Sequence, residues 1–270
     1  MIISDYPIGV FDSGLGGLTV VKAIREQLPN ESIIYLGDTA RVPYGDKSRT
    51  TVQKYSFEIA EFLLEKKVKA IVVACNTATA LALDELEDHL SVPVMGVIHP
   101  GAKAAEGKTE IKRIGVIGTT ATIQSGTYEK QLKLINQGLS VVSQACPLLV
   151  PLAEDGWMKE KVVKDILTYY LDPLIKDDID TLILGCTHYP VFSTLIGDIV
   201  GPDITLIDSP AEVSIALLDL LKENNLLNKK NYPGNLDSFV TDKTSSFPLI
   251  AERFLGRPVS NLCFTDISQN

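Results

Sequence analysis

Residues 70–75 read AIVVAC and residues 181–186 read TLILGC, two short apolar runs that each end in a cysteine. Runs of this length that are rich in Val, Ile and Leu are typical of buried strands in a parallel sheet. An amide or hydroxyl residue follows each cysteine, Asn76 in the first run and Thr187 in the second. Because ligands bind beyond the carboxyl ends of strands in open parallel sheets, both runs predict a strand that ends at a binding site.

The sequence around these two runs recurs in the same order. IGVFDS at 8–13, SIIYLGD at 32–38 and MGVIHP at 95–100 are matched by IGVIGT at 114–119, SVVSQAC at 140–146 and TLIDSP at 205–210. With the cysteine runs included, the matching stretches lie 106–111 residues apart. Matches in order at nearly constant spacing indicate an internal repeat, and chance similarity among Val/Ile-rich strands is the alternative.

Apolar runs alternate with amphipathic stretches along the chain, which is typical of parallel α/β architecture. Strands are predicted at 7–11, 32–37, 69–74 and 93–98, and again at 113–118, 139–144, 181–185 and 204–208. Helices are predicted at 17–28, 50–67, 77–90, 125–137, 156–173 and 190–200. The tail is expected to contain a helix at about 211–223, a strand at 238–241 and a helix at 246–255, and to pack on the first unit.

We therefore predict an α/β fold with two pseudosymmetric parallel-sheet α/β domains that face each other across an active-site cleft. Residues 1–98 and 210–270 would form a discontinuous first domain, and residues 99–209 would form the second.

Composition limits the possible partners. The chain has 270 residues, with 25 Lys and Arg against 34 Asp and Glu, so its net charge is −9. An acidic chain is poorly suited to grip nucleic acid or an anionic membrane, which needs a basic face. No run approaches the ~20 apolar residues of a membrane span, and the first residues lack the features of a signal peptide. We expect a cytoplasmic protein that acts on a small molecule, without a nucleic-acid or membrane partner.

The cysteines are the main candidates for chemically active residues. The chain has four, Cys75, Cys146, Cys186 and Cys263, with no CxxC motif and only three histidines, so neither disulfides nor a metal site is expected. Cys75 and Cys186 are equivalent in the repeat, which would direct two sulfurs into a cleft from opposite sides. Two acid/base groups on opposite faces of one carbon can invert its configuration, and a thiol with a reference pKa of ~8.5 suits that task.

Other interpretations of the two cysteines stay open at this point: a buried pair, a redox pair or metal ligands. Cys146 matches Asp38 in the repeat and has no assigned role, and Cys263 lies in an apolar context that predicts a small buried side chain. Trp157 is most simply interpreted as a packing residue.

Two loops at strand ends are expected to face a ligand. FDSGLGG at 11–17 has Thr19 where a dinucleotide-binding GxGxxG would need its last glycine, and Asp12 would repel a pyrophosphate. Its glycines instead allow backbone N–H groups to approach a smaller anion such as a carboxylate. GDTARVPYG at 37–45 places Asp, Arg and Tyr together in a turn. Glu154 follows an apolar run, and composition alone predicts that it is a solvated surface residue.

Together, FDSGLGG, GDTARVPYG, ACNTAT at 74–79 and GCTHYP at 185–190 resemble the glutamate racemases, within the cofactor-independent aspartate/glutamate racemase family. The resemblance implies that Cys75 and Cys186 are the acid/base residues, with Asp12 assisting the first and His188 and Glu154 assisting the second. It also implies substrate-binding positions at Asp12, Ser13, Tyr44, Gly45, Asn76, Thr77, Thr187 and His188. His188 favours glutamate as the substrate, because related aspartate racemases typically carry a Glu residue in place of this histidine.

The resemblance further implies racemisation of glutamate without a cofactor or metal, a homodimer, and supply of D-glutamate for the peptidoglycan of the cell wall and so for cell shape. No lysine lies in the strand-end motifs, which independently favours a site without pyridoxal phosphate. Three alternatives remain: a racemase for another acidic amino acid such as aspartate, a Cys-His hydrolase, and a non-catalytic amino-acid-binding protein.

Overall fold

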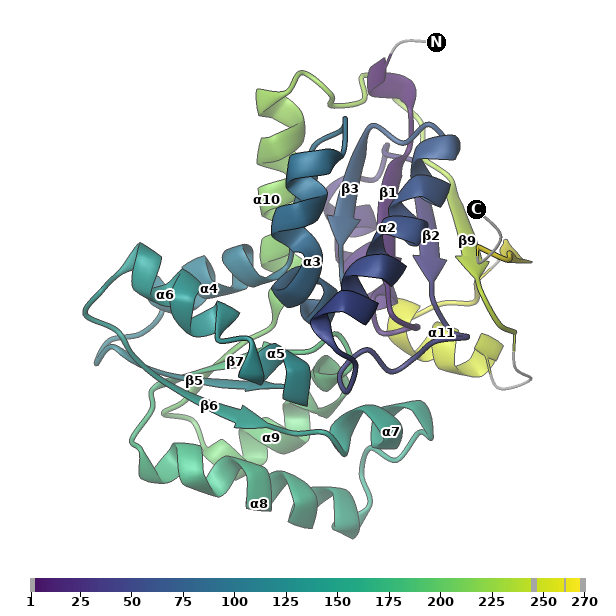
Figure 1. Cartoon of the computed structure of the whole chain (residues 1–270). Coiled ribbons are helices and arrows are strands. Elements are labelled where there is room, and N and C mark those ends of the chain that lie inside the picture. Colours follow the sequence, from purple (N-terminus) through teal and green to yellow (C-terminus); the bar gives the residue numbers. More distant parts are fainter. Residues whose placement is uncertain (1–2, 244–246, 260, 268–270) are drawn as a thin grey trace.

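Two parallel sheets form the core of the protein (Figure 1). The computed structural model describes residues 3–243, 247–259 and 261–267. Across those residues the first sheet has the strand order β10-β9-β2-β1-β3-β4 and the second has the order β6-β5-β7-β8. Neighbouring strands run parallel in both sheets. The first sheet contains β1 (Ile8–Asp12), β2 (Ile33–Gly37), β3 (Ala70–Val73), β4 (Val94–Gly96), β9 (Leu236–Val240) and β10 (Leu262–Phe264). The second contains β5 (Arg113–Gly118), β6 (Ser140–Ala145), β7 (Thr181–Gly185) and β8 (Thr205–Ile207).

The two sheets repeat one topology. The order β2-β1-β3-β4 in the first sheet corresponds to β6-β5-β7-β8 in the second. Register is repeated too, since Ile8 pairs with Ala70 and Ile114 pairs with Thr181, the residues that the sequence repeat aligns. The prediction of an α/β fold with two related parallel sheets is confirmed.

Helices connect the strands of the two sheets. They are α1 (Leu18–Gln27), α2 (Arg49–Glu65), α3 (Asn76–His89), α4 (Ile98–Glu106), α5 (Thr120–Gln124), α6 (Thr127–Ile135), α7 (Leu149–Glu154), α8 (Lys161–Lys176), α9 (Ser193–Val200), α10 (Ser209–Glu223) and α11 (Phe247–Leu255). Two short 3₁₀ turns, η1 (Ile3–Asp5) and η2 (Tyr189–Phe192), complete the set. In Figure 1 the α3, α4, α5 and α6 helices lie where the two sheets approach each other.

Several helix boundaries differ from the sequence prediction. The helix expected at 125–137 is α6, which begins at Thr127 because Gly126 has a φ of +66° that a continuing helix cannot accommodate; the same residue separates α6 from α5. Similarly, α8 begins at Lys161 rather than at 156, where Gly156 has a φ of +82°. The predicted start of the last helix, residue 246, lies outside the described residues.

Three helices, α4, α5 and α7, were not predicted at all. Two of them, α4 and α7, carry a proline in the first turn, Pro100 and Pro151. A proline at this position is compatible with a helix because the first N–H groups have no partner within the helix. In the sequence alone, the same prolines indicate a chain break.

The tail returns to the first sheet. Its strand β9 pairs with β2, where Ile33 lies opposite Leu236, and β10 pairs with β9 at the edge. The α10 helix packs against α1 and α4. We propose that residues 1–98 with 210–270, and residues 99–209, form the two domains.

Two side chains expected inside the protein are exposed. Cys263 lies in β10, an edge strand whose outer side has no further strand in the described residues, and it is accessible to solvent. Trp157 lies in the turn between α7 and α8 and is 47% exposed. Among the described residues, no helix combines the length and the apolar character needed to cross a membrane.

Candidate active site

The two cysteines of the repeat lie at the carboxyl ends of the central strands β3 and β7. Cys75 begins the α3 helix as its N-cap, and its Sγ accepts a hydrogen bond from the backbone N–H of Ala78 at 3.4 Å. Cys186 follows Gly185, and its carbonyl accepts the N–H of Tyr189, which begins the η2 turn. Both thiols are buried, with residue exposures of 5% and 6%. The strand ends therefore hold the sulfurs in a site from which bulk water is largely excluded.

Ser13 and Asp12, from the end of β1, lie on the Cys75 side. The Cys75 thiol donates to Ser13 Oγ at 3.6 Å, and Asp12 Oδ2 accepts the N–H of Gly14 at 3.1 Å. Burial raises the pKa of Cys75 to about 12, with further increases from Asp12 and Cys186 that the N–H of Ala78 and Ser13 partly oppose. Cys75 is therefore a neutral thiol at physiological pH. Burial also raises the pKa of Asp12, against the lowering effect of His188.

His188 and Glu154 lie on the Cys186 side. The ring Nδ1 of His188 is 3.9 Å from Cys186 Sγ, and its Nε2 is 3.2 Å from Glu154 Oε1. Burial lowers the pKa of His188, but its hydrogen bonds to Cys186 and Glu154 and the charges of Cys186 and Asp12 outweigh burial and raise that pKa to about 10. Glu154 ends α7 with a side chain that is only 31% exposed, so the expectation of a solvated surface residue was wrong.

A hydrogen bond from Thr187 connects the Cys186 side of the site to the Cys75 side. Thr187 Oγ1 donates to Asp12 Oδ1 at 3.4 Å and lies 3.4 Å from His188 Nδ1. The pKa shifts of Asp12 and His188 each include the other residue as a cause. Side chains from the ends of β1 and β7 therefore share one electrostatic environment, although Asp12 and Thr187 are 175 positions apart in the sequence.

Hydroxyl and amide groups line the start of α3. Thr77 Oγ1 lies 2.9 Å from Thr119 Oγ1 and 3.2 Å from Thr122 Oγ1, so hydroxyl groups from both sheets meet at the helix start. Asn76 is buried, and its Oδ1 accepts the phenol of Tyr128 at 2.7 Å. These residues bring donors to the amino end of a helix, where anions are favoured.

The loop that contains Tyr44 and Gly45 completes the junction. Tyr44 is buried and donates to Asp38, which also accepts Arg41 Nε at 2.7 Å and Thr241 Oγ1 at 2.8 Å. Gly45 accepts the N–H of Ala121 through its carbonyl at 2.8 Å, which ties this loop of the first sheet to the second.

Gly45 has no room for a side chain. A Cβ there would lie 2.7 Å from Thr119 Cβ, a distance that real side chains do not adopt. The structure therefore places all the residues singled out from the motifs at this one junction of the two sheets.

Cavities lie at the margins of the junction. One of about 380 Å³ is bounded by Gly14, Val42, Glu154, Phe247 and Arg253, so it opens beside the His188–Glu154 pair. The Nη1 of Arg253 donates to the carbonyl of Ala153 at 3.0 Å, which brings α11 of the tail against α7. The cavity borders Glu154, and neither cysteine lines it.

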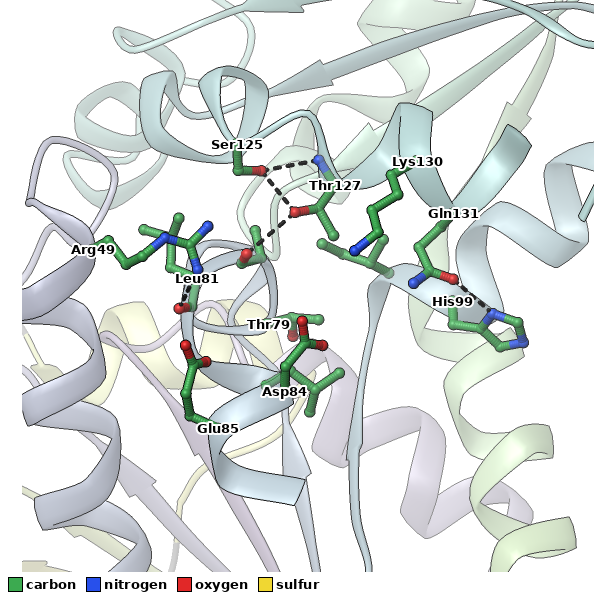
Figure 2. Close-up of a pocket in the computed structure, with 13 residues that line it drawn as sticks. Arg49, Thr79, Leu81, Asp84, Glu85, His99, Ser125, Thr127, Lys130 and Gln131 are labelled. Carbon is green, nitrogen blue, oxygen red and sulfur yellow. Dashed lines mark hydrogen bonds between the residues drawn. The ribbon is translucent and has the colours of Figure 1, made fainter. Parts of the chain in front are cut away.

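A separate crevice lies between the later turns of α3 and the α5–α6 connection. Figure 2 shows Asp84 and Lys130 directed into it from opposite sides. Thr127 Oγ1 donates across it to the carbonyl of Ala80 at 3.2 Å. The crevice has a volume of about 130 Å³ and is lined by neither cysteine. In the described part of the chain, no group of three or more His, Cys, Asp or Glu side chains is arranged to hold a metal ion.

The model of one protein family, described as Asp/Glu/hydantoin racemase, matches residues 8–214. The chain belongs to this family. A curated glutamate racemase from Geobacter metallireducens is 49% identical over 249 residues, 92% of each chain. One from Bacillus cereus is 44% identical over 255 residues, 94% of this chain and 95% of the relative.

Solved structures of family members superpose closely on the chain. A glutamate racemase isoform from Bacillus anthracis has a TM-score of 0.94 at 47% identity and covers 97% of this chain and 98% of its own. Another from Francisella tularensis, in complex with D-glutamate, has a TM-score of 0.93 at 40% identity and covers 99% and 100%. The prediction that the protein is a racemase of this family is confirmed.

Several residues of the junction carried no motif signal. Tyr128 lies within α6 and Thr122 within α5, and nothing in the adjacent sequence distinguishes them from other helix residues. Both reach the site only because α5 and α6 pack against α3 and the end of β7. Thr119 and Asp38 were recognisable as the residues that follow predicted strands, as the rule for parallel sheets requires.

Proposed function

We propose that the protein interconverts L- and D-glutamate by moving a proton between two cysteines, without a cofactor. The observation that carries this proposal is the pair of buried thiols at equivalent strand ends, each with its own acid/base partner. Cys75 lies beside Ser13 and Asp12, and Cys186 lies beside His188, which in turn contacts Glu154. The curated relatives named glutamate racemase support glutamate as the substrate.

The two thiols are in different charge states in this proposal. His188, with its pKa near 10, carries a proton at neutral pH and stabilises a thiolate at Cys186 by its charge. Cys75 keeps its proton, since its pKa is about 12. With L-glutamate bound, the Cys186 thiolate removes the α-proton and the Cys75 thiol delivers its proton to the opposite face. The products are D-glutamate, a thiol at Cys186 and a thiolate at Cys75, and the reverse reaction restores the first state.

Removal of the α-proton leaves a carbanion whose charge spreads into the α-carboxylate. Ser13, Asn76, Thr77 and Thr187 offer neutral donors near the two thiols, and α3 presents its amino end in the same place. Preorganised donors in a site that excludes water stabilise developing charge more than they stabilise the ground state. Asp12 would assist proton transfer at Cys75, and Tyr44 with Gly45 would close the site over the substrate.

The resemblance implies the cellular role. We propose that the product supplies D-glutamate for peptidoglycan synthesis and thus for cell-wall formation and cell shape, in the cytoplasm, and that the enzyme acts as a homodimer. These points rest on family membership and not on a contact in the structure.

Exchange of the α-hydrogen with solvent tests the reaction. In D₂O, with no cofactor added, the protein should incorporate deuterium at Cα of glutamate from either enantiomer, measured by NMR or mass spectrometry. Aspartate, run in parallel, decides the acidic amino acid. Absence of exchange from both glutamate enantiomers would reject racemisation, and binding of glutamate without exchange would indicate an amino-acid-binding protein.

Substitution of each thiol tests the two-base assignment. Cys75→Ser and Cys186→Ser should each lower racemisation by about 10²–10⁴-fold, the usual contribution of one positioned acid/base group. Circular dichroism should show an intact fold in both variants. Full activity in either would refute the role of that cysteine, and an acyl-enzyme trapped on Cys186 would favour the hydrolase.

A further inference from the structure

Tyr128 is a buried side chain that contacts the neighbourhood of both cysteines. It lies on α6, is 2% exposed, and donates its phenol hydrogen to Asn76 Oδ1 at 2.7 Å. Asn76 directly follows Cys75 and is the first residue of α3. A tyrosine from the half of the chain that contains the second sheet therefore holds the residue next to the first cysteine.

The ring of Tyr128 packs against Gly185, the residue before the second cysteine. A Cβ built on Gly185, the residue before Cys186, would lie 2.9 Å from Tyr128 Cε2. Burial raises the pKa of Tyr128, against the lowering effect of Ser209 and with a smaller increase from Cys186, so the phenol stays neutral and remains a donor over the physiological range. Tyr128 thus lies between the residues that flank the two sulfurs.

Asn76 has two chemically different ends, and only one suits an anion. Its Oδ1 accepts the phenol, which leaves Nδ2 as the end of the amide that can donate to a ligand. An amide nitrogen would donate to a substrate carboxylate, whereas the amide oxygen in that place would repel it. The orientation of the Asn76 amide therefore decides whether it favours or opposes substrate.

We propose that Tyr128 is a positioning residue that fixes the Asn76 amide with Nδ2 directed to the substrate carboxylate. This inference rests on the proposed function, because it concerns the same site and the same anionic substrate. Tyr128 does not touch the reacting atoms; its phenol also lies near Ser209, and in this proposal its effect on the substrate passes through Asn76. Loss of its hydroxyl group would leave the ring in place beneath Gly185 but would free the amide to rotate.

A double-mutant cycle tests this dependence. Tyr128→Phe should lower kcat/KM for glutamate about tenfold, as expected when a buried acceptor loses its partner. In an Asn76→Ala background the same Tyr128→Phe change should alter kcat/KM by less than about twofold, because residues that act through one another are not additive. If the Asn76→Ala variants turn over too slowly, the cycle is run on the dissociation constant of D-glutamate by calorimetry.

Tyr189→Phe is the matched control. Tyr189 is also a buried tyrosine near the site, but its phenol donates to the carbonyl of Cys146 at 2.8 Å and not to Asn76. Its effect, whatever its size, should be the same with and without Asn76→Ala.

The inference is overturned if Tyr128→Phe leaves kcat/KM unchanged, or if its loss simply multiplies with that of Asn76→Ala. Wild-type exchange is measured first. If the wild type does not exchange the α-hydrogen, the proposed function fails, whereas an active wild type with an additive cycle rejects only the role of Tyr128.

Discussion

Replacing Glu154 by glutamine tests the electrostatic account of the Cys186 side. Glu154 Oε1 lies 3.2 Å from His188 Nε2 and is one of the causes that raise the pKa of His188 to about 10. Glutamine keeps the size and an oxygen acceptor but removes the negative charge. The pKa of His188 must then fall, so the imidazolium beside Cys186 is lost at a lower pH. The alkaline limb of the pH–rate profile should move down.

The magnitude follows from the geometry. A hydrogen bond to a charged group contributes roughly 1.5–3 kcal/mol when it is buried. The Glu154 side chain is 31% exposed, so solvent screening reduces this to about 1 kcal/mol. Since one pH unit corresponds to about 1.36 kcal/mol, the limb should move down by about 0.7 of a pH unit.

The assay measures kcat/KM for glutamate over a pH series that brackets the His188 pKa of about 10. Asp155→Asn is the matched control, because it removes the same charge one residue further along the chain from an exposed side chain. Circular dichroism at each pH would exclude unfolding as the cause of any change. An unmoved limb, an upward movement, or an equal movement in Asp155→Asn would refute the reasoning.

Two further predictions concern sites outside the reaction. Glu31→Gln should lower the free energy of unfolding by about 3–5 kcal/mol, because it leaves the fully buried ammonium of Lys69 without its anionic partner. Urea denaturation measures the loss, which Glu31→Gln/Lys69→Met should largely restore, while racemisation by the folded protein stays unchanged. Iodoacetamide should alkylate the exposed Cys263 before the three buried cysteines. Peptide mass spectrometry should locate this first label while activity is retained, and early inactivation would contradict the burial of Cys75 and Cys186.

The repeat was readable from the sequence because parallel strands buried on both faces must be continuously apolar. AIVVAC and TLILGC satisfy that requirement, and the residues that follow them mark the strand ends. The register confirms the alignment residue by residue, since Ile8 opposite Ala70 corresponds to Ile114 opposite Thr181. Strand ends therefore predicted most of the candidate site before any contact was known.

Residues that reach the site through helix packing were not predictable in the same way. In the sequence, Glu154 has the context of a surface carboxylate. In the structure it ends α7, which places it beside His188. This helix was not predicted because Pro151 lies in its first turn. Tyr128 is a helical tyrosine, and whether its side chain faces the site depends on the rotation of α6 about its own axis. Composition and spacing carry no information on that rotation, which is determined by contacts with distant elements such as α4.

A net charge of −9 opposes the binding of an anionic substrate. The candidate site offers neutral hydrogen-bond donors that would offset this repulsion. None of the predicted substrate-binding positions is a lysine or arginine, and the charged group His188 lies beside Cys186. A fixed cation on the α-carboxylate would bind the ground state strongly, which lowers KM without a matching gain in kcat. Hydroxyl, amide and helix N–H donors strengthen as charge grows on the carboxylate during proton removal. In the proposed cofactor-free reaction, that difference in free energy between ground state and transition state is what the site must supply, and neutral donors at two strand ends are suited to supply it.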